Sequence, residues 1–92
     1  MALAGNVALV TGSSRQMGRV IALALAAQGA NVVINGVTDQ AAIDSTVAEA
    51  HALGVKAIGV KADVRDRDAV DAMVAQAAAE LGGPVDILVN CP

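Results

Sequence analysis

The sequence predicts an α/β domain built on one parallel sheet, with the element order βαβαβαβ. Short apolar runs, typical of strands buried on both faces, alternate with longer stretches that repeat apolar residues at helical spacing. Turn residues separate these segments, and no low-complexity tract interrupts them. Strands that alternate with helices over short loops form a parallel sheet with right-handed crossovers. The expected strand order is 3-2-1-4, which is the first half of a doubly wound sheet, and the second half is absent from these 92 residues.

Four apolar runs are the predicted strands. The first ends at the turn signal Gly12, and each later one follows a stretch with helical spacing. The last lies two residues before the end of the sequence. The predicted strands cover residues 7–11, 31–35, 57–60 and 86–90.

Two helices are predicted between the first three strands. The first runs from Arg19 to Gln28, is rich in Ala and Leu, and has Gly29 placed to cap its C-terminus. The second begins after the polar loop 36–39, which offers an N-cap, and ends at Gly54. Its inward stripe, at helical spacing, is Ile43, Val47 and Ala50.

A third helix is predicted before the last strand. Asp66 is placed to cap its N-terminus, and a Gly-Gly-Pro sequence at 82–84 ends it. Its expected inward face consists of Val70, Met73, Val74, Ala77 and Leu81.

Composition limits the class of protein. The 92 residues leave room for one domain, 1–92, and a content of 55% hydrophobic residues excludes disorder. There is no Phe, Tyr or Trp, the net charge is −3 and the basic residues are dispersed, so no nucleic-acid surface is expected. The longest apolar run, Val20–Ala27, has eight residues, far fewer than the ~20 that span a bilayer, so no membrane association is expected.

Two isolated residues predict no special chemistry. The single cysteine, Cys91, excludes a disulfide framework and has no activating neighbour in the sequence. His51 has no partner at metal-ligand spacing and is expected to be an exposed helix residue, so no metal site is predicted.

Residues 1–5 have neither the charged start nor the apolar stretch of a signal peptide. A cytoplasmic location is therefore expected.

The glycines after the first strand indicate a phosphate site. Gly12 follows the strand directly and Gly18 opens the helix, where unpartnered backbone N–H groups and the helix dipole favour an anion. A P-loop would need four residues between its glycines and then Lys with Ser or Thr, but five residues intervene here and Arg19 follows. The turn therefore predicts the dinucleotide site of a Rossmann-type domain. A tight strand-to-helix turn that binds nothing remains the alternative.

Three motifs resemble those of one family. The turn TGSSRQMG at 11–18 resembles the T-G-x-x-x-G-x-G turn of the short-chain dehydrogenase/reductase family, and Asp63-Val64 is similar to its adenine-contacting pair. The DILVN run at 86–90 is similar to the lead-in to its Asn-Asn-Ala-Gly motif, and the whole chain looks closest to the 3-oxoacyl-carrier-protein reductase-like members. Asp63 could equally be a turn residue that satisfies loop N–H groups. The resemblance implies a dinucleotide partner held by Gly12, Ser14, Arg15, Gln16, Met17, Gly18, Asn35, Asp63, Val64 and Asn90.

The sequence departs from the family pattern at two places. Gln16 replaces the middle glycine, and if this position needs a left-handed backbone a Gln costs about 1–2 kcal/mol there. Its side chain would also crowd the pyrophosphate, so weakened cofactor binding is predicted. Asn90 is followed by Cys91-Pro92 in place of Asn-Ala-Gly, as expected from a truncation or a change of reading frame.

The residues near the second strand favour NADP over NAD. A carboxylate at the end of that strand would hydrogen-bond the ribose and repel a 2′-phosphate, but Asn35 occupies this place. Arg15 is placed as in family members that pair a basic residue with the 2′-phosphate. Val37 argues for NAD, because related reductases often carry a second basic residue there. Asp39 is expected to act only as a helix cap.

The resemblance implies hydride transfer between a nicotinamide and a carbonyl or alcohol, with Tyr, Lys and Ser as catalytic residues. This sequence has no Tyr, and its two lysines, Lys56 and Lys61, flank the third strand. No catalytic residue is therefore expected within these 92 residues, and a small-molecule substrate is expected only in a complete enzyme.

Three interpretations remain open. The chain is the cofactor-binding part of an NADP-dependent oxidoreductase, or a nucleotide-binding module without catalysis, or a fragment that keeps the fold but binds no cofactor. Self-association is predicted, through an unpaired edge at the fourth strand or through the apolar sheet face that the missing helices would cover.

Overall fold

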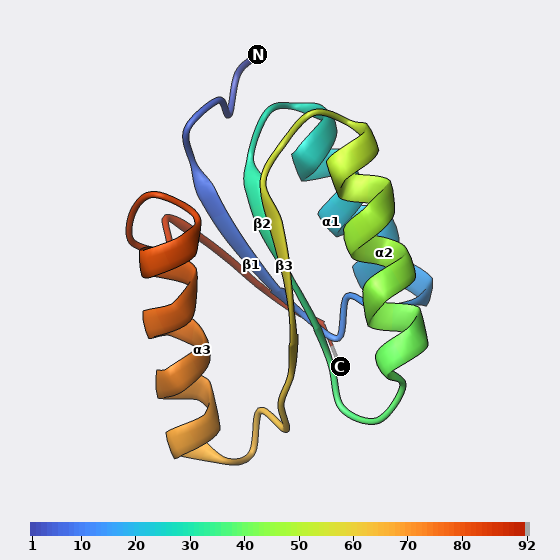
Figure 1. The fold of residues 1–92 in the computed structure, drawn as a ribbon, viewed down its shortest axis with the longest axis vertical. Helices are drawn as coiled ribbons and strands as arrows, with labels where there is room; N and C mark the ends of the chain where they lie inside the picture. The colour runs from blue at the N-terminus through green and yellow to red at the C-terminus, as the bar shows by residue number, and fades with distance from the viewer. Residues whose placement is uncertain (92) are drawn as a thin grey trace.

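The computed structural model describes residues 1–91 and shows a four-stranded parallel sheet with helices on both faces (Figure 1). The strand order is β3-β2-β1-β4, which confirms the predicted order. None of the helices in the described part is long and apolar enough to cross a membrane. The elements are β1 (Val7–Thr11), α1 (Gln16–Ala27), β2 (Asn31–Gly36), α2 (Gln40–Ala52), β3 (Ala57–Lys61), α3 (Arg67–Glu80) and β4 (Ile87–Asn90).

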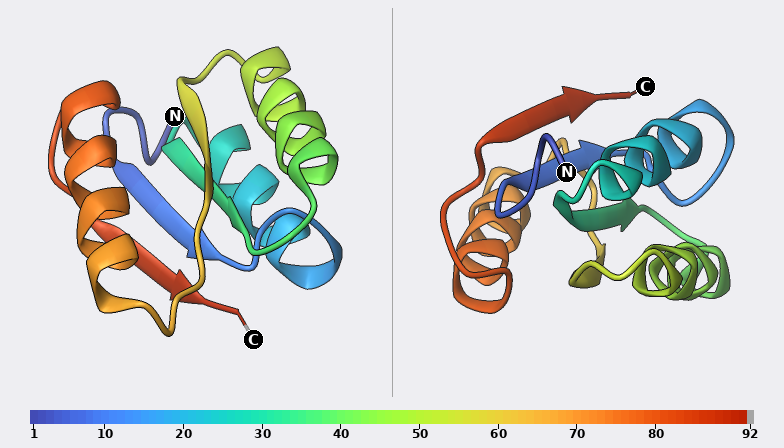
Figure 2. Two further views of the ribbon diagram at one scale, coloured as in Figure 1. Left: turned by 60° about the horizontal axis from the view of Figure 1, so that its bottom comes forward. Right: turned by 90° about the horizontal axis from the view of Figure 1, so that it is seen from above.

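The helices bury the central strands from both sides. α1 and α2 cover one face of the sheet and α3 covers the other (Figure 2). Ala8 and Val10 of β1 belong to the core under α1 and α2, whereas Val7 and Leu9 belong to the core under α3. All residues of β1 are buried, which confirms the prediction of a strand covered on both faces.

Helix α1 begins three residues earlier than predicted, at Gln16 and not at Arg19. Gly18 therefore lies inside the first turn, where a Cβ on it would stand 2.1 Å from the Gly12 carbonyl oxygen. This glycine permits the helix to pack against the preceding turn, and it does not mark where the helix starts. The other end lies one residue before the predicted one, since Ala27 is the last helical residue and Gln28 is the C-cap. Gly29 follows with φ +99°, as expected of a glycine that ends a helix.

Both aspartate caps are confirmed, but one predicted core residue of α3 is wrong. Asp39 accepts a hydrogen bond from the Ala42 amide at 3.0 Å, and Asp66 accepts one from the Ala69 amide at 3.2 Å. Val74 is 39% exposed, because α3 meets the sheet along the narrow stripe of residues spaced four apart and Val74 lies beside it. The buried residues of this stripe are Met73, Ala77 and Leu81.

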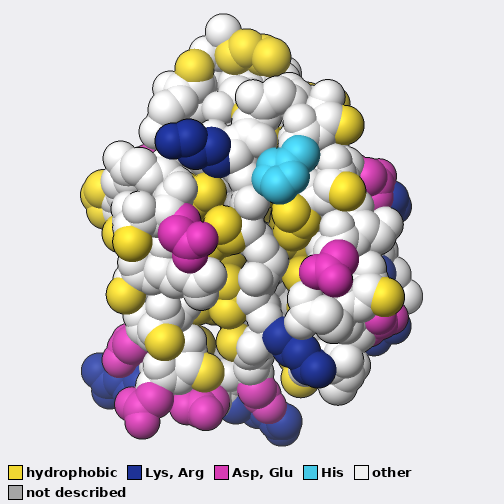
Figure 3. All heavy atoms as spheres, in the orientation of Figure 1, with side chains coloured by type: hydrophobic (Ala, Val, Ile, Leu, Met, Phe, Trp, Pro, Cys, Tyr) yellow, Lys and Arg dark blue, Asp and Glu magenta, His cyan; other side chains and the backbone are white. Residues whose placement is uncertain are grey.

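Three strands, β2, β3 and β4, differ from the predicted bounds by one residue. β4 begins at Ile87, and the preceding Asp86 is tied to β1 through its carboxylate, which accepts a hydrogen bond from the Val7 amide at 2.8 Å. β2 extends to Gly36 and β3 extends to Lys61. β3 forms one edge of the sheet, and hydrophobic side chains are visible over it between α3 and α2 (Figure 3). β4 forms the opposite edge.

Candidate functional site

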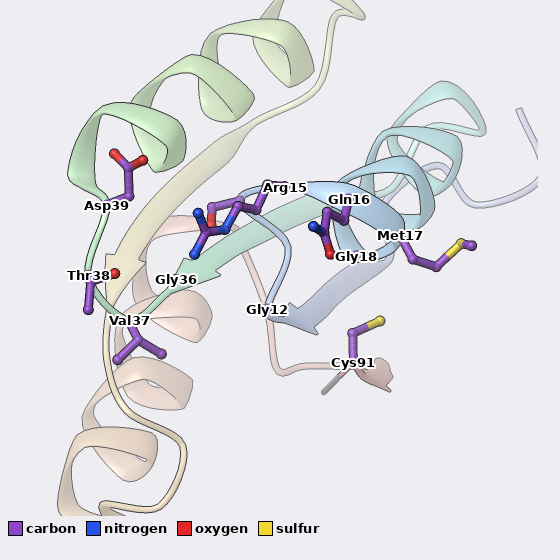
Figure 4. Close-up of a pocket in the computed structure, with 11 residues that line it drawn as sticks. Gly12, Arg15, Gln16, Met17, Gly18, Gly36, Val37, Thr38, Asp39 and Cys91 are labelled. Atoms are coloured by element: carbon purple, nitrogen blue, oxygen red, sulfur yellow. The ribbon is translucent and has the colours of Figure 1, made fainter.

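A cavity of about 410 Å³ opens at the carboxyl ends of β1 and β2 (Figure 4). The turn from β1 to α1 forms one wall and the loop from β2 to α2 forms another. In parallel α/β sheets, ligands bind outside the carboxyl ends of the strands, so the position alone indicates a binding site. The cavity is lined by Gly12, Ser14, Arg15, Gln16, Met17, Gly18, Gly36, Val37, Thr38, Asp39 and Cys91.

The N-terminus of α1 differs from those of the other two helices. No side chain within residues 1–91 caps it, and its first turn contains no acidic residue. Asp39 and Asp66, in contrast, cap α2 and α3. The first backbone N–H groups of α1 therefore lie beside the cavity without a side-chain partner in the described part of the chain. Such a helix end suits an anion such as a pyrophosphate.

Gly12 holds the turn close to the end of β4. Its φ is +61°, and a Cβ on it would stand 2.9 Å from the Cys91 carbonyl oxygen. Thr11 also joins the end of β1 to the end of β4. Its hydroxyl donates a hydrogen bond to Asn90 Oδ1 at 2.8 Å and accepts one from the Cys91 amide at 3.0 Å. Asn90, a predicted site residue, is therefore engaged with Thr11 and does not line the cavity. Cys91, which has no activating neighbour in the sequence, becomes part of the wall through this contact.

Gln16 adopts the left-handed conformation on which its predicted effect depends. Its φ is +55°, a region that costs a residue with a side chain about 1–2 kcal/mol relative to glycine. The side chain is exposed and lies at the cavity wall near Gly18 (Figure 4). The neighbouring Met17 is 68% exposed and points away from the cavity (Figure 4). Gln16 thus stands where an anion would approach the helix end.

Arg15 supplies positive charge to the other side of the cavity. Its guanidinium extends toward Gly36 and Val37 from the turn (Figure 4). Ser14 is buried beneath it, and the Ser14 hydroxyl lies 2.8 Å from the place of a Cβ on Gly36. Asp39 also lines the cavity, but its carboxylate is occupied with capping α2, as the sequence predicts. At this corner of the cavity, the positive charge of Arg15 therefore lies beside Gly36, whose missing side chain leaves space in front of the guanidinium.

Asn35 lies outside the cavity and holds the sheet together. It is 1% exposed, and its Oδ1 accepts from the Gly12 amide at 3.1 Å. Its Nδ2 donates to the carbonyl oxygens of Val60 and Ala62, both at 3.1 Å. All of these partners are backbone groups, so the side chain is committed to the fold. The position that faces the cavity at the end of β2 is Gly36, one residue after the predicted one.

Asp63 and Val64 follow β3 and do not line the cavity. The Asp63 carboxylate accepts from the Arg65 guanidinium, with Nη2 to Oδ2 at 2.8 Å, and from the Arg65 amide at 2.9 Å. These hydrogen bonds lower the pKa of Asp63 from 3.8 to about 2. The bonds from the guanidinium make the larger contribution and the bond from the amide the smaller one. Val64 is 44% exposed beside this ion pair. The structure therefore shows the turn role that was the alternative for Asp63.

Replacing Arg65 by Ala is expected to raise the pKa of Asp63 from about 2 toward 3.8. Because the folded-state pKa is lowered, the stabilisation from this pair is complete well above pH 3.8 and is lost as the pH falls toward 2. A carboxyl-detected NMR titration of both proteins measures the shift. Arg67→Ala, a change two positions away at the start of α3, serves as the control and should leave the Asp63 pKa unchanged.

Sequence reasoning missed the loop side of the cavity. Gly36, Val37, Thr38 and Asp39 line it together, although the sequence singled out only Val37 and Asp39 and assigned neither to the site. The signal was available, because the loops after adjacent parallel strands meet at the same end of a sheet. His51 lies elsewhere, at the end of α2, with Nε2 3.1 Å from the Ala57 carbonyl oxygen, and is exposed as predicted.

Comparisons with known proteins point to one family. A family model described as short chain dehydrogenase matches residues 6–92. A 2-dehydro-3-deoxy-D-gluconate 5-dehydrogenase of Formosa agariphila is 45% identical over 86 residues, covering 94% of this chain and 32% of the relative. A 3-oxoacyl-(acyl-carrier-protein) reductase of Synechocystis sp. is 45% identical over 89 residues, which cover 97% of this chain and 36% of the relative.

A solved structure agrees in fold and in sequence. It is a short chain dehydrogenase from Burkholderia cenocepacia in complex with NADP, with a TM-score of 0.92 and 44% identity. The match covers 98% of this chain and 36% of that one. The chain thus spans about a third of the length of the relatives that it matches.

Proposed function

Because the chain belongs to the short chain dehydrogenase family, we propose that it is the cofactor-binding part of an NADP(H)-dependent oxidoreductase acting on a carbonyl or alcohol. The observation that carries this proposal is the uncapped N-terminus of α1, which opens on the cavity formed by the glycine turn. The NADP complex of a relative with 44% identity supports the choice of ligand. Residues 1–92 are proposed to form one cofactor-binding unit.

The cavity fits the phosphate end of such a cofactor. Gly12 leaves the backbone bare where a Cβ would meet the Cys91 carbonyl, and the first N–H groups of α1 would hold the pyrophosphate. Three predicted site residues do not line the cavity and would support the cofactor only indirectly, through the residues that do: Asp63, Val64 and Asn90. The nicotinamide, when bound, supplies a hydride donor or acceptor.

We propose that the cavity prefers NADP to NAD. Arg15 reaches the corner beside Gly36, where a glycine places no carboxylate in front of a 2′-phosphate (Figure 4). Gly36 thus takes the discriminating position that the sequence suggested for Asn35. A Cβ on Gly36 would stand 2.8 Å from the Ser14 hydroxyl, so this space is kept by the packing beneath it.

Arg15→Ala is expected to weaken NADPH binding by roughly 10-fold or more, because a charge-assisted hydrogen bond to phosphate is lost. NADH binding should change by less than about twofold, since NADH has no 2′-phosphate for the guanidinium to contact. Isothermal titration calorimetry with both cofactors measures the two effects. Arg67→Ala, the same change on α3, should alter neither affinity. Equal losses for NADPH and NADH would contradict the assignment of Arg15 to the 2′-phosphate.

Calorimetric titration of the unchanged chain tests the function itself. Saturable binding of NADPH, tighter than that of NADH, supports the proposal. A chain that is folded by circular dichroism but binds neither cofactor, even with Gln16 replaced by Gly, would refute it. That result would favour the interpretation in which the fold is kept without a ligand.

We propose that catalysis needs residues outside this sequence. The family reaction implies a Tyr as acid and base, and these 92 residues contain none. The substrate would therefore be met only by a longer protein. The expected cytoplasmic location and the expected lack of nucleic-acid and membrane partners stay predictions.

We also propose that the 92-residue chain self-associates. Large apolar side chains are exposed at several places, including Met17 at 68% and Leu88 at 65%. Within residues 1–91, β4 pairs with a strand on one side only, and an unpaired strand edge can pair with another chain. Light scattering that shows a single monomeric species at ~100 μM would count against this proposal, since weak interfaces of small area act in this range.

A further inference from the structure

Thr46 is a buried residue of α2 whose hydroxyl reaches a carbonyl oxygen outside its own helix. The residue is 1% exposed. Its Oγ1 lies 2.9 Å from the Ala42 carbonyl oxygen, four residues earlier in α2, and 3.2 Å from the Ser14 carbonyl oxygen. The first contact is the local one that a helical threonine commonly makes. The second joins α2 to the turn that forms one wall of the cavity.

The Ser14 carbonyl lies just before the hydrogen-bond ladder of α1. That ladder begins where the Arg19 amide donates to the Arg15 carbonyl at 3.4 Å. The Ser14 carbonyl therefore takes its hydrogen bond from a side chain of α2. Ser14 is 9% exposed, so its carbonyl has little access to water, and a buried carbonyl without a partner is unfavourable.

The Thr46 hydroxyl has only one hydrogen, which it donates to one of the two carbonyls at a time. The Ala42 carbonyl already accepts from the Thr46 amide in the ladder of α2. The Ser14 carbonyl has no place in such a ladder. The hydroxyl therefore contributes more at Ser14, although it lies nearer to the Ala42 oxygen.

The direction of the Ser14 carbonyl decides where the Arg15 side chain starts. A trans peptide is planar, so this carbonyl and the Arg15 Cα lie in one plane. The preceding Ser13 is fixed to the sheet, because its amide donates to the Asn35 carbonyl at 2.8 Å. The Ser14–Arg15 peptide thus lies between a residue fixed to β2 and the start of α1, and Thr46 holds it from the side of α2.

The same bond couples the two walls of the cavity. The loop opposite the turn continues directly into α2, where Asp39 both lines the cavity and caps the helix. Thr46 lies in the second turn of that helix. One turn further along, an ion pair joins α2 to α1, with Arg19 Nε 3.1 Å from Glu49 Oε1. The position of Arg15 relative to the loop therefore depends on how α2 contacts the turn.

We propose that Thr46 is a positioning residue for the preference for NADP and acts through Arg15. By holding the Ser14 carbonyl it holds the Arg15 guanidinium at the corner beside Gly36, where a 2′-phosphate would bind (Figure 4). The N–H groups that would hold the pyrophosphate, which both cofactors share, follow Arg15 and are oriented by α1 itself. This role rests on the proposed function and adds a residue outside the cavity to its specificity.

Calorimetric titration of Thr46→Val with NADPH and NADH is the main test. Valine has the same shape without the hydroxyl, so NADPH affinity should fall roughly 3- to 10-fold, as for one lost hydrogen bond, and NADH affinity by less than about twofold. Thr46→Ser keeps the hydroxyl and should retain the preference for NADPH to within about twofold. Ser45→Val puts a valine at the exposed neighbouring position of α2 and should alter neither affinity.

Two further measurements keep the result independent of any one variant. Circular dichroism verifies that each variant is folded, and Thr46→Ala, which also lacks the hydroxyl, should show the same selective loss of NADPH affinity. If the unchanged chain binds too weakly to measure, the same series is run with Gln16 replaced by Gly.

A double-mutant cycle tests the route through Arg15. In an Arg15→Ala background, Thr46→Val should change NADPH affinity by less than about twofold, because the guanidinium that Thr46 positions is already absent. A merely structural role would instead weaken both cofactors equally and add to the loss from Arg15→Ala.

The outcomes separate this role from the proposed function. Equal losses for the two cofactors, additive losses in the cycle, or an unchanged preference in both Thr46→Val and Thr46→Ala would overturn the role of Thr46 and leave the proposed function standing. A chain that binds neither cofactor, with Gln16 or with Gly at that position, would overturn both. Binding of NADH as tight as that of NADPH by the unchanged chain would do the same.

Discussion

Replacing Gln16 by Gly is expected to tighten NADPH binding about 10-fold, because it clears the end of α1 for the phosphates. The side chain of Gln16 lines the cavity in front of the first helical turn. The same change is expected to raise the free energy of unfolding by up to about 1 kcal/mol. Glycine removes the 1–2 kcal/mol cost of the left-handed backbone, and part of that gain is offset by the greater freedom of glycine in the unfolded chain. Calorimetric titration and denaturant unfolding measure the two effects.

Gln16→Ala separates the effect of side-chain crowding on binding from the effect of the left-handed backbone on stability. Alanine removes the amide group but keeps a Cβ at φ +55°, so the backbone cost remains. If crowding by the long side chain limits binding, Gln16→Ala should tighten binding nearly as much as Gln16→Gly, with little gain in stability. An affinity for NADPH that stays within twofold of the unchanged chain in Gln16→Gly would contradict the crowding argument.

The fold was predictable because its signals are local. The apolar runs of β1 and β2, the two aspartate caps and the glycine after α1 each act within a few residues. Val74 shows the limit of such reasoning. Its helical position is compatible with the inward face, and only the placement of α3 on the sheet decides that Met73 is buried and Val74 is not.

The site was predictable on its turn side but not on its loop side. The residues of the turn from Gly12 to Gly18 are continuous in sequence, so one motif identifies them together. Cys91 joins the wall through a contact across 79 positions, which no spacing rule reveals. The sequence predicted Asn35 at the cavity, whereas the structure places Gly36 there, and this difference has another cause. Side chains alternate along a strand, so an uncertainty of one residue in where β2 ends reverses which side chain faces the cavity.

Asn35→Ala is expected to lower the free energy of unfolding by about 3–5 kcal/mol, since three backbone groups lose their partner and each buried unsatisfied group costs about 1–3 kcal/mol. Two of the three hydrogen bonds are only partly buried, which keeps the total in the lower part of that range. The groups are the Gly12 amide and the carbonyls of Val60 and Ala62. Small domains have only about 5–15 kcal/mol in total, so the loss should appear as a large drop in the denaturation midpoint. Asn6→Ala is the matched control, because the hydrogen bonds of Asn6 within residues 1–91 run through its backbone.

Asn35→Asp distinguishes a structural role from a role in ribose binding. A carboxylate keeps the acceptor for the Gly12 amide but turns the donor toward Val60 and Ala62 into a second acceptor, so at neutral pH it should destabilise the fold at least as much as Ala. Lowering the pH should restore part of the loss, because a protonated carboxyl regains one donor. If Asn35 instead contacted the ribose, Asp would switch preference from NADPH toward NADH and leave the denaturation midpoint unchanged. Denaturant unfolding at pH 7 and pH 4, together with titration of both cofactors, separates these outcomes. The saturation of all three Asn35 bonds by backbone groups is the reason to expect the first.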